Sequence, residues 1–187
     1  MPFLGVEKQH YLQLEEKIKG TYKERNLFSN QAPFAIVPKI VVVDNKNAGS
    51  LETVNVMKVE VHLSIQDLDN QIVFSKYKTT SIATGKGASE AISKAIKQFK
   101  TSDPKLKSFF ADADKSITTF YKNNCSKILN AARTNVDRKE YNKAYSLLKY
   151  VPESASCFKD AERMITKIYS DNKDENCRDM LHKAQLK

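Results

Sequence analysis

The sequence contains no tryptophan, and glycine and proline are scarce, at five each in 187 residues. Such low glycine and proline contents exclude collagen-like and linker-like chains. No apolar run approaches the roughly 20 residues of a membrane-spanning helix. The first residues lack the basic start and apolar stretch of a secretory signal. We therefore expect a folded protein that has no membrane span and is made and kept in the cytoplasm.

Cysteine is also rare. The three cysteines are Cys125, Cys157 and Cys177, an odd number at wide spacing. They form neither a CxxC pair nor the regular framework of a disulfide-rich domain. The sequence therefore predicts reduced, packed thiols.

Motifs for catalysis or for metal binding are missing as well. The segment Gly85-Lys86-Gly87 lacks the GxxxxGK[ST] spacing of a phosphate-binding loop, so it predicts a turn between a strand and a helix. His10, His62 and His182 each lack a second ligand at metal-binding spacing. No GxSxG motif or Cys–His partnership is present. We expect no catalytic residue, no cofactor and no metal, and hence a protein that is not an enzyme.

Lysine and arginine number 31 against 22 acidic residues, a formal charge of +9. Such an excess is compatible with binding to phosphates. The basic residues are scattered, however, and most stand beside acidic ones, which is typical of a solvated surface. Nucleic acid is therefore an alternative partner that the pattern does not favour.

The N-terminal half predicts an α+β arrangement. Apolar residues at three- and four-residue spacing predict a helix over 6–28 and, after the sheet, another over 88–99. Three segments between them read as strands, 34–43, 54–66 and 72–83, and 44–49 reads as a loop. Pro38 places the first strand at an edge or a bulge. A change of apolar phase between Val56 and Val59 indicates a second bulge.

The middle strand alternates between apolar and polar side chains. Val59, Val61, Leu63 and Ile65 are expected to point into the core. The intervening polar positions are our candidates for contacts with a partner: Lys58, Glu60, His62 and Ser64.

The C-terminal half predicts helices throughout. Asp103-Pro104 is a typical start, and one long helix or two in series is expected over 104–134. A turn at 135–137, helices over 141–151 and 158–169, and a weakly helical tail from 174 complete the chain. We expect two domains, an α+β hairpin domain over 1–102 and a helical domain over 103–187.

Two resemblances add to this interpretation. The stretches FAIVPKIVVVD and VNVMKVEVHLSIQDLDNQIVFSKYKTTSIATGKGASEAISKAIKQF resemble the β-β-β-α unit of CsgG-like (curli-secretion) and related outer-membrane lipoprotein families. The resemblance covers about a third of the chain and implies the ring-forming tendency of that fold. The lipidation cysteine and membrane-spanning insert of the secretion channel are absent.

The second half is similar to tetratricopeptide-like helix pairs. Ile128, Ala131 and Ala132, followed by Tyr141, Ala144 and Leu148, keep the spacing of small and large residues with which such helices pack. About one and a half repeats are present, too few for an independent solenoid.

These features favour a non-enzymatic structural subunit of a large assembly, most concretely a self-associating ring or adaptor protein in the neck or tail of a tailed bacteriophage. Such a protein would be found in the virion after assembly in the host cytoplasm. The alternatives are an accessory protein-binding component of a bacterial envelope or secretion system, and a basic nucleic-acid-binding protein.

Overall fold

The computed structural model describes residues 5–22, 34–48, 54–68 and 71–185, and the side chains of all of these except 21–22 and 174–185. It has the predicted α+β fold: a helix, three strands and further helices. The chain divides into two compact units, Met1–Asp114 and Lys115–Lys187. The division lies later than the one expected after residue 102, because the first turns of a long helix belong with the sheet.

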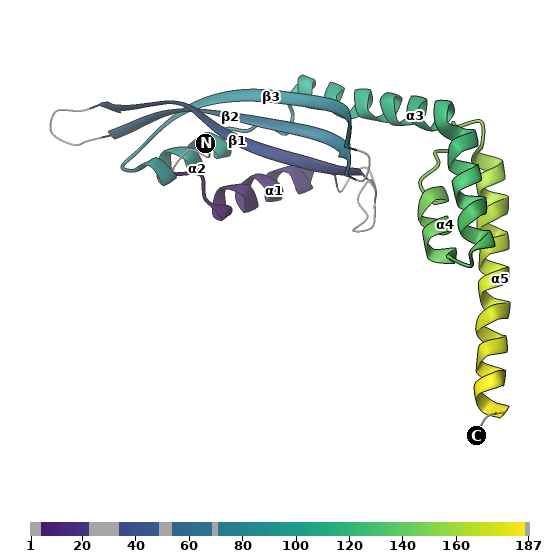
Figure 1. Cartoon of the computed structure of the whole chain (residues 1–187). Helices are drawn as coiled ribbons and strands as arrows, with labels where there is room; N and C mark the ends of the chain where they lie inside the picture. The colour runs from purple at the N-terminus through teal and green to yellow at the C-terminus, as the bar shows by residue number, and fades with distance from the viewer. Residues whose placement is uncertain (1–4, 23–33, 49–53, 69–70, 186–187) are drawn as a thin grey trace. The chain divides into compact units, whose positions relative to one another are not determined.

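The first unit is built on a three-stranded antiparallel sheet in the order β1-β2-β3 (Figure 1). Its strands are β1 (Phe34–Ala48), β2 (Val54–Asp67) and β3 (Ile72–Gly85). Strand β1, which contains Pro38, is an edge strand as predicted. Strand β3 forms the other edge, so β2 is flanked on both sides.

Strand β1 differs from its prediction in length. It continues through Asn45 and Lys46 to Ala48, where the composition predicts a loop. The polar segment stays extended because Val54–Met57 of β2 provide backbone partners for it. The register shifts between Val42 and Asp44, which places a bulge at Val43. The bulge expected on β2 between Val56 and Val59 is therefore wrong, because β2 alternates regularly and Met57 is buried.

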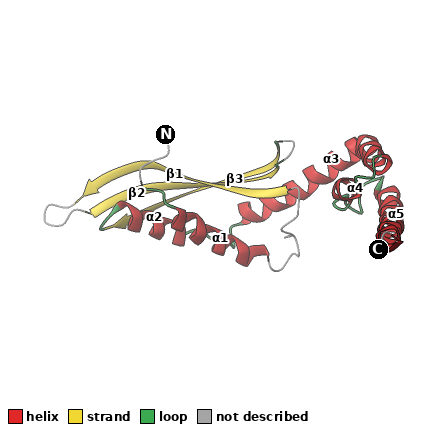
Figure 2. Ribbon diagram, turned by 60° about the horizontal axis from the view of Figure 1, so that its bottom comes forward, coloured by secondary structure: helices red, strands yellow, loops and turns green. Residues whose placement is uncertain are grey.

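The inner face of the sheet is covered by two helices, α1 (Lys8–Tyr22) and α2 (Ala88–Lys97), which lie on the same side (Figure 2). Helix α2 packs on β2 and β3. Its apolar stripe is almost completely inaccessible to solvent and consists of Ala91, Ile92, Ala95 and Ile96. Facing it are the predicted core residues of β2, Val59, Val61, Leu63 and Ile65, all buried. Replacing a buried isoleucine such as Ile92 by alanine typically lowers the free energy of unfolding by about 2–5 kcal/mol.

Helix α1 is anchored to α2 through a buried histidine. The Nδ1 atom of His10 accepts a hydrogen bond from the amide of Glu7 at 2.9 Å, and its Nε2 atom lies 3.1 Å from the carbonyl oxygen of Ser89. The first bond assigns the ring proton to Nε2, which then donates to Ser89. His10 is thus a fully buried link between helices. Residues 23–28, which we expected to continue this helix, lie outside the described part of the chain.

The turn from β3 into α2 requires glycine at residue 85. A Cβ atom on Gly85 would lie 2.5 Å from the backbone nitrogen of Ala91. The strand-to-helix turn predicted for Gly85–Gly87 is confirmed, and its reason is this close approach rather than an unusual backbone angle.

The long helix α3 (Pro104–Asp137) begins as predicted. The carboxylate of Asp103 accepts the amide hydrogen of Lys105 at 2.9 Å and the hydroxyl hydrogen of Tyr77 at 2.8 Å. Burial, followed by the bond to Asp103, raises the pKa of Tyr77 to about 12. The ring of Tyr77 also contacts Phe99 and Phe109, which ties the start of α3 to β3.

The second unit contains the rest of α3 with α4 (Tyr141–Leu148) and α5 (Phe158–Gln185). Helix α3 runs through 135–137, where we expected a turn, and ends in a Schellman motif. Lys139 has a positive φ of 61°, its amide donates to Val136, and the amide of Glu140 donates to Asn135. The turn comes later than predicted because these two bonds satisfy the last carbonyls of the helix.

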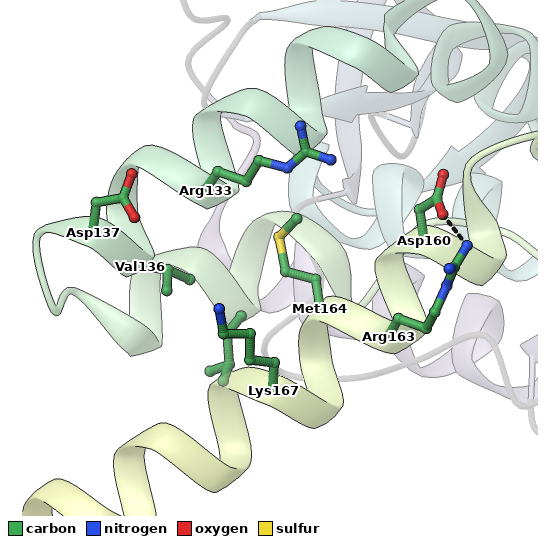
Figure 3. Close-up of a pocket in the computed structure, with 8 residues that line it drawn as sticks. Arg133, Val136, Asp137, Asp160, Arg163, Met164 and Lys167 are labelled. Atoms are coloured by element: carbon green, nitrogen blue, oxygen red, sulfur yellow. Dashed lines mark hydrogen bonds and ion pairs between the residues drawn. The ribbon is translucent and has the colours of Figure 1, made fainter.

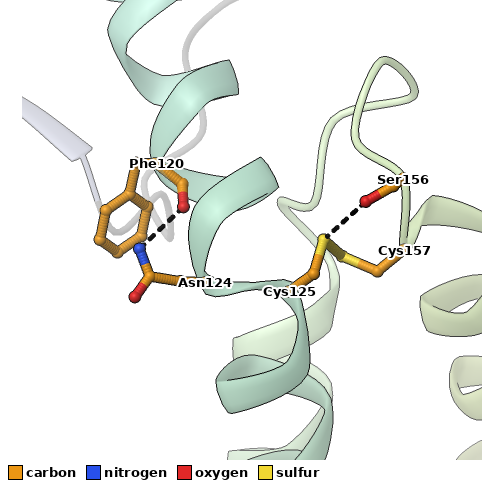
Figure 4. The surroundings of a disulfide bond; sticks show 5 residues. All are labelled: Phe120, Asn124, Cys125, Ser156 and Cys157. Atoms are coloured by element: carbon orange, nitrogen blue, oxygen red, sulfur yellow. Dashed lines mark hydrogen bonds between the residues drawn. A yellow bond between two sulfur atoms is a disulfide. The ribbon is translucent and has the colours of Figure 1, made fainter.

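The prediction of reduced cysteines is wrong for two of the three. Cys125 of α3 and Cys157, just before α5, form a disulfide with a Cα–Cα distance of 5.6 Å (Figure 4). The sulfur of Cys125 also lies 3.6 Å from the hydroxyl oxygen of Ser156. The two cysteines are separated by 32 residues. No local sequence signal marks such a pair, because only the packing of the helices brings the cysteines together.

We predict that this disulfide stabilises the helical unit substantially. Closing a loop of this length lowers the entropy of the unfolded chain by the equivalent of about 3–4 kcal/mol. A reductant, or the double replacement Cys125→Ser with Cys157→Ser, should lower the free energy of unfolding by that amount. Urea unfolding followed by helical circular dichroism measures it. The double variant is the control, since a reductant should leave its unfolding curve unchanged; an unchanged curve for the reduced wild type would contradict the assignment.

Candidate functional site

The candidate site is the side of the sheet opposite α1 and α2, which we call the outer face. Strand alternation and register assign the following residues to it: Val37, Lys39, Val41, Asp44 and Lys46 of β1; Val56, Lys58, Glu60, His62 and Ser64 of β2; Val73, Lys76, Lys78, Thr80 and Ile82 of β3. Within the first unit, the described helices α1 and α2 lie on the other side of the sheet and leave this face uncovered (Figure 2). Ile82 is 60% exposed there, although it is a large apolar residue.

The structure brings all four predicted contact residues onto this face. Lys58 is exposed, and Glu60, His62 and Ser64 are half-buried, as expected for the central strand of an uncovered sheet. The sequence pattern of β2 was sufficient to find them, because side chains of a strand alternate between its faces.

Glu60 is the electrostatic centre of the outer face. Its carboxylate is 2.8 Å from the Nζ atom of Lys78 and 2.9 Å from the Nε2 atom of His62. These hydrogen bonds, that of Lys78 first, lower the pKa of Glu60 below its usual value. Glu60 is therefore an anion at neutral pH whose charge is already compensated within the face.

The neighbouring strands contribute basic residues that the sequence analysis missed. His62 lies between Lys39 of β1 and Lys78 of β3 in the register, and Lys76 lies opposite Ser64. The outer face as a whole carries five lysines and two carboxylates, a net charge of +3. Lys46 pairs with Asp44 at 3.3 Å and Lys78 with Glu60. Among the described residues, Lys39, Lys58 and Lys76 have no ion pair.

The outer face carries no aromatic side chain at the positions assigned to it. Single-stranded nucleic acid is usually bound by stacking its bases on exposed aromatic rings. The buried aromatic residues Tyr77, Phe99 and Phe109 pack against one another instead. The face is thus basic and partly apolar but provides no stacking platform.

The second unit has an open pocket of about 450 Å³ between α3 and α5 (Figure 3). Its lining includes the apolar residues Val136, Met164 and Ile168. Arg163 pairs with Asp160 at its rim. The rest of the lining is charged and consists of Arg133, Asp137, Asp160, Arg163 and Lys167.

Within the described part of the chain, no three histidine, cysteine or acidic residues lie close enough together to hold a metal ion. The helices of that part include none with both the length and the apolar character needed to span a membrane.

Comparisons with known proteins place the chain in no family. No family model matches the sequence, and no curated protein matches it. A crystal structure of a "putative lipoprotein" from Caulobacter crescentus CB15 has a TM-score of 0.34 and 13% sequence identity, covering 61% of this chain and 88% of that one. A score this low carries no argument. The CsgG-like and tetratricopeptide-like resemblances stay predictions.

We predict that substitutions on the two faces of β2 will have opposite consequences. Val61→Asp places a charge among buried side chains and should cost at least about 3 kcal/mol, enough to unfold most of the protein. His62→Ala removes a partly exposed partner of Glu60 and should change the free energy of unfolding by less than about 1 kcal/mol. Thermal unfolding of both variants tests this. Equal losses would show that the outer face is covered in the folded protein.

Proposed function

We propose that this chain is a non-enzymatic structural subunit that associates with other protein subunits through its open sheet. The most concrete setting is a self-associating ring or adaptor in the neck or tail of a tailed bacteriophage. The observation that carries the proposal is the outer edge of β3, which pairs with no strand in the described part of the chain. A free edge presents unpaired amides and carbonyls that bind an extended segment of a neighbouring subunit.

The two edges of the sheet are not equivalent. Edge β1 carries Pro38 and the bulge at Val43, two features that prevent regular pairing with another strand. Edge β3 has no proline over Ile72–Gly85, and its own bulge, at Phe74, lies close to its beginning and leaves Ser75–Gly85 in regular register. Pairing of the β3 edge with the same edge of a second copy would give a twofold dimer. Pairing of the β3 edge with a different extended segment of the neighbour is head-to-tail and closes into a ring when its rotation allows, so the proposed ring uses this second kind of contact.

The direction of one backbone carbonyl shows which residues of β3 point their backbone amides away from β2. The carbonyl oxygen of Ile82 accepts a hydrogen bond from the side-chain amide of Gln98 at 3.1 Å, so it points away from β2. The amide and carbonyl of one residue in a strand point to the same side, and those of the next residue point to the opposite side. The amide of Thr80, two residues before Ile82, therefore also points away from β2. A proline at residue 80 would therefore remove one outward-pointing donor of this edge.

The native mass of the purified protein tests this proposal. The wild type should form a discrete oligomer, and Thr80→Pro should shift it toward the 21.2 kDa monomer. Thr80→Ala is the matched control, since it removes the same side chain but keeps the amide, and it should stay oligomeric. Circular dichroism verifies that both variants fold. A wild type that remains monomeric at every concentration would refute the proposal.

The disulfide favours a second candidate, an accessory protein-binding component of a bacterial envelope or secretion system. Disulfides persist in the periplasm and on cell or virion surfaces and are rare in the cytoplasm. Cys125–Cys157 is therefore expected of a protein that works outside the cytoplasm, in an envelope or in a released virion.

Alkylating free thiols in intact producing cells separates these two settings. If the protein belongs to the envelope, Cys125 and Cys157 should be protected before lysis. If it is assembled in the host cytoplasm, both should be alkylated in cells and oxidised only in released particles. Mass spectrometry of the peptides that contain the two residues reads the result.

A further inference from the structure

We propose that the outer face binds an acidic surface of a different protein, with Lys39, Lys58 and Lys76 as its contacts. This inference rests on the proposed function and names the partner chemistry of its site. It starts from the ion pairs within the face. Glu60 is compensated by Lys78 and His62, and Asp44 by Lys46. The three remaining lysines have no carboxylate within salt-bridge distance among the described residues.

The arrangement of the three lysines matches a protein surface of moderate size. They lie on three different strands: Lys39 opposite His62, Lys76 opposite Ser64, and Lys58 between Asp44 and Ile82 in the register. Adjacent strands are about 4.8 Å apart, so the lysines spread over the width of the sheet rather than lining one row. Carboxylates spaced over a folded surface or segment can reach them together.

Apolar side chains between the lysines argue for a protein. Val37 and Val41 of β1 lie half-buried on the outer face, and Val73 and Ile82 of β3 are exposed. A polyphosphate chain gains nothing from such groups, whereas a protein interface combines a partly apolar centre with a charged rim. The missing aromatic residues also remove the usual means of holding single-stranded bases.

Charge also argues against a second copy of this face as the occupant. Two identical faces that meet about a twofold axis would bring the unpaired lysines of one against those of the other. Like charges opposed at an interface cost free energy, and this face has no unpaired glutamate to offset them. Self-association is thus assigned to the β3 edge and the acidic partner to the outer face.

A charge-matched pair of variants tests the assignment. The probe is a fluorescein-labelled decaglutamate peptide, whose anisotropy is measured at low salt with the full chain. The double variant Lys39→Gln with Lys76→Gln should weaken binding about tenfold, since it removes two of the three lysines that are proposed to contact carboxylates of the partner. The control, Lys105→Gln with Lys107→Gln, removes the same charge from exposed positions at the start of α3. It should weaken binding less than about twofold.

Three outcomes would overturn the inference. The wild type fails to bind the peptide; both double variants lose affinity equally, which indicates a response to net charge alone; or the Lys39/Lys76 variant loses binding to a short DNA duplex but not to the peptide, which indicates nucleic acid. Native mass measured on the same samples keeps the two proposals separate. If the protein is an oligomer and one of these outcomes is found, this inference falls and the proposed function stays intact.

Discussion

The contact between α2 and the inner side chains of β2 and β3 organises the first unit. Helix α2 is only ten residues long and offers two isoleucines and two alanines to the sheet, yet these four are almost completely buried. The alanines let the helix approach closely, and the isoleucines supply most of the apolar volume that it buries against β2 and β3. Helix α1 and the first turns of α3 then attach around this contact, through His10 and Tyr77. The described helices of the first unit all pack on this one side of the sheet or at its edge.

That division separates stability from binding. Inner positions of β2 determine whether the sheet forms, while its outer positions lie among lysines and threonines whose replacement costs little. An open sheet normally invites uncontrolled pairing with other chains. Here β1 is interrupted by Pro38 and a bulge, and the outer face carries a net positive charge.

The sequence was informative where a pattern is local. The alternation in β2 correctly predicted the side on which His62 and its neighbours lie, and Asp103-Pro104 correctly predicted the start of α3. The sequence failed to predict features that depend on contacts between distant segments of the chain. Backbone pairing with Val54–Met57 holds a polar stretch of β1 in a strand, and helix packing joins Cys125 to Cys157. Lys39 and Lys76 could have been found by aligning the strands in register across the hairpin, but each looks like an ordinary surface lysine within its own strand.

Gly85 shows how tightly the hairpin and α2 are coupled. Because a side chain at this residue would lie 2.5 Å from the backbone of Ala91, well inside van der Waals contact, any replacement must displace the first turn of the helix. A helix moves as a rigid rod, so this displacement would withdraw all four of its buried side chains at once. A single methyl group at the end of a strand would thus loosen the whole inner layer together.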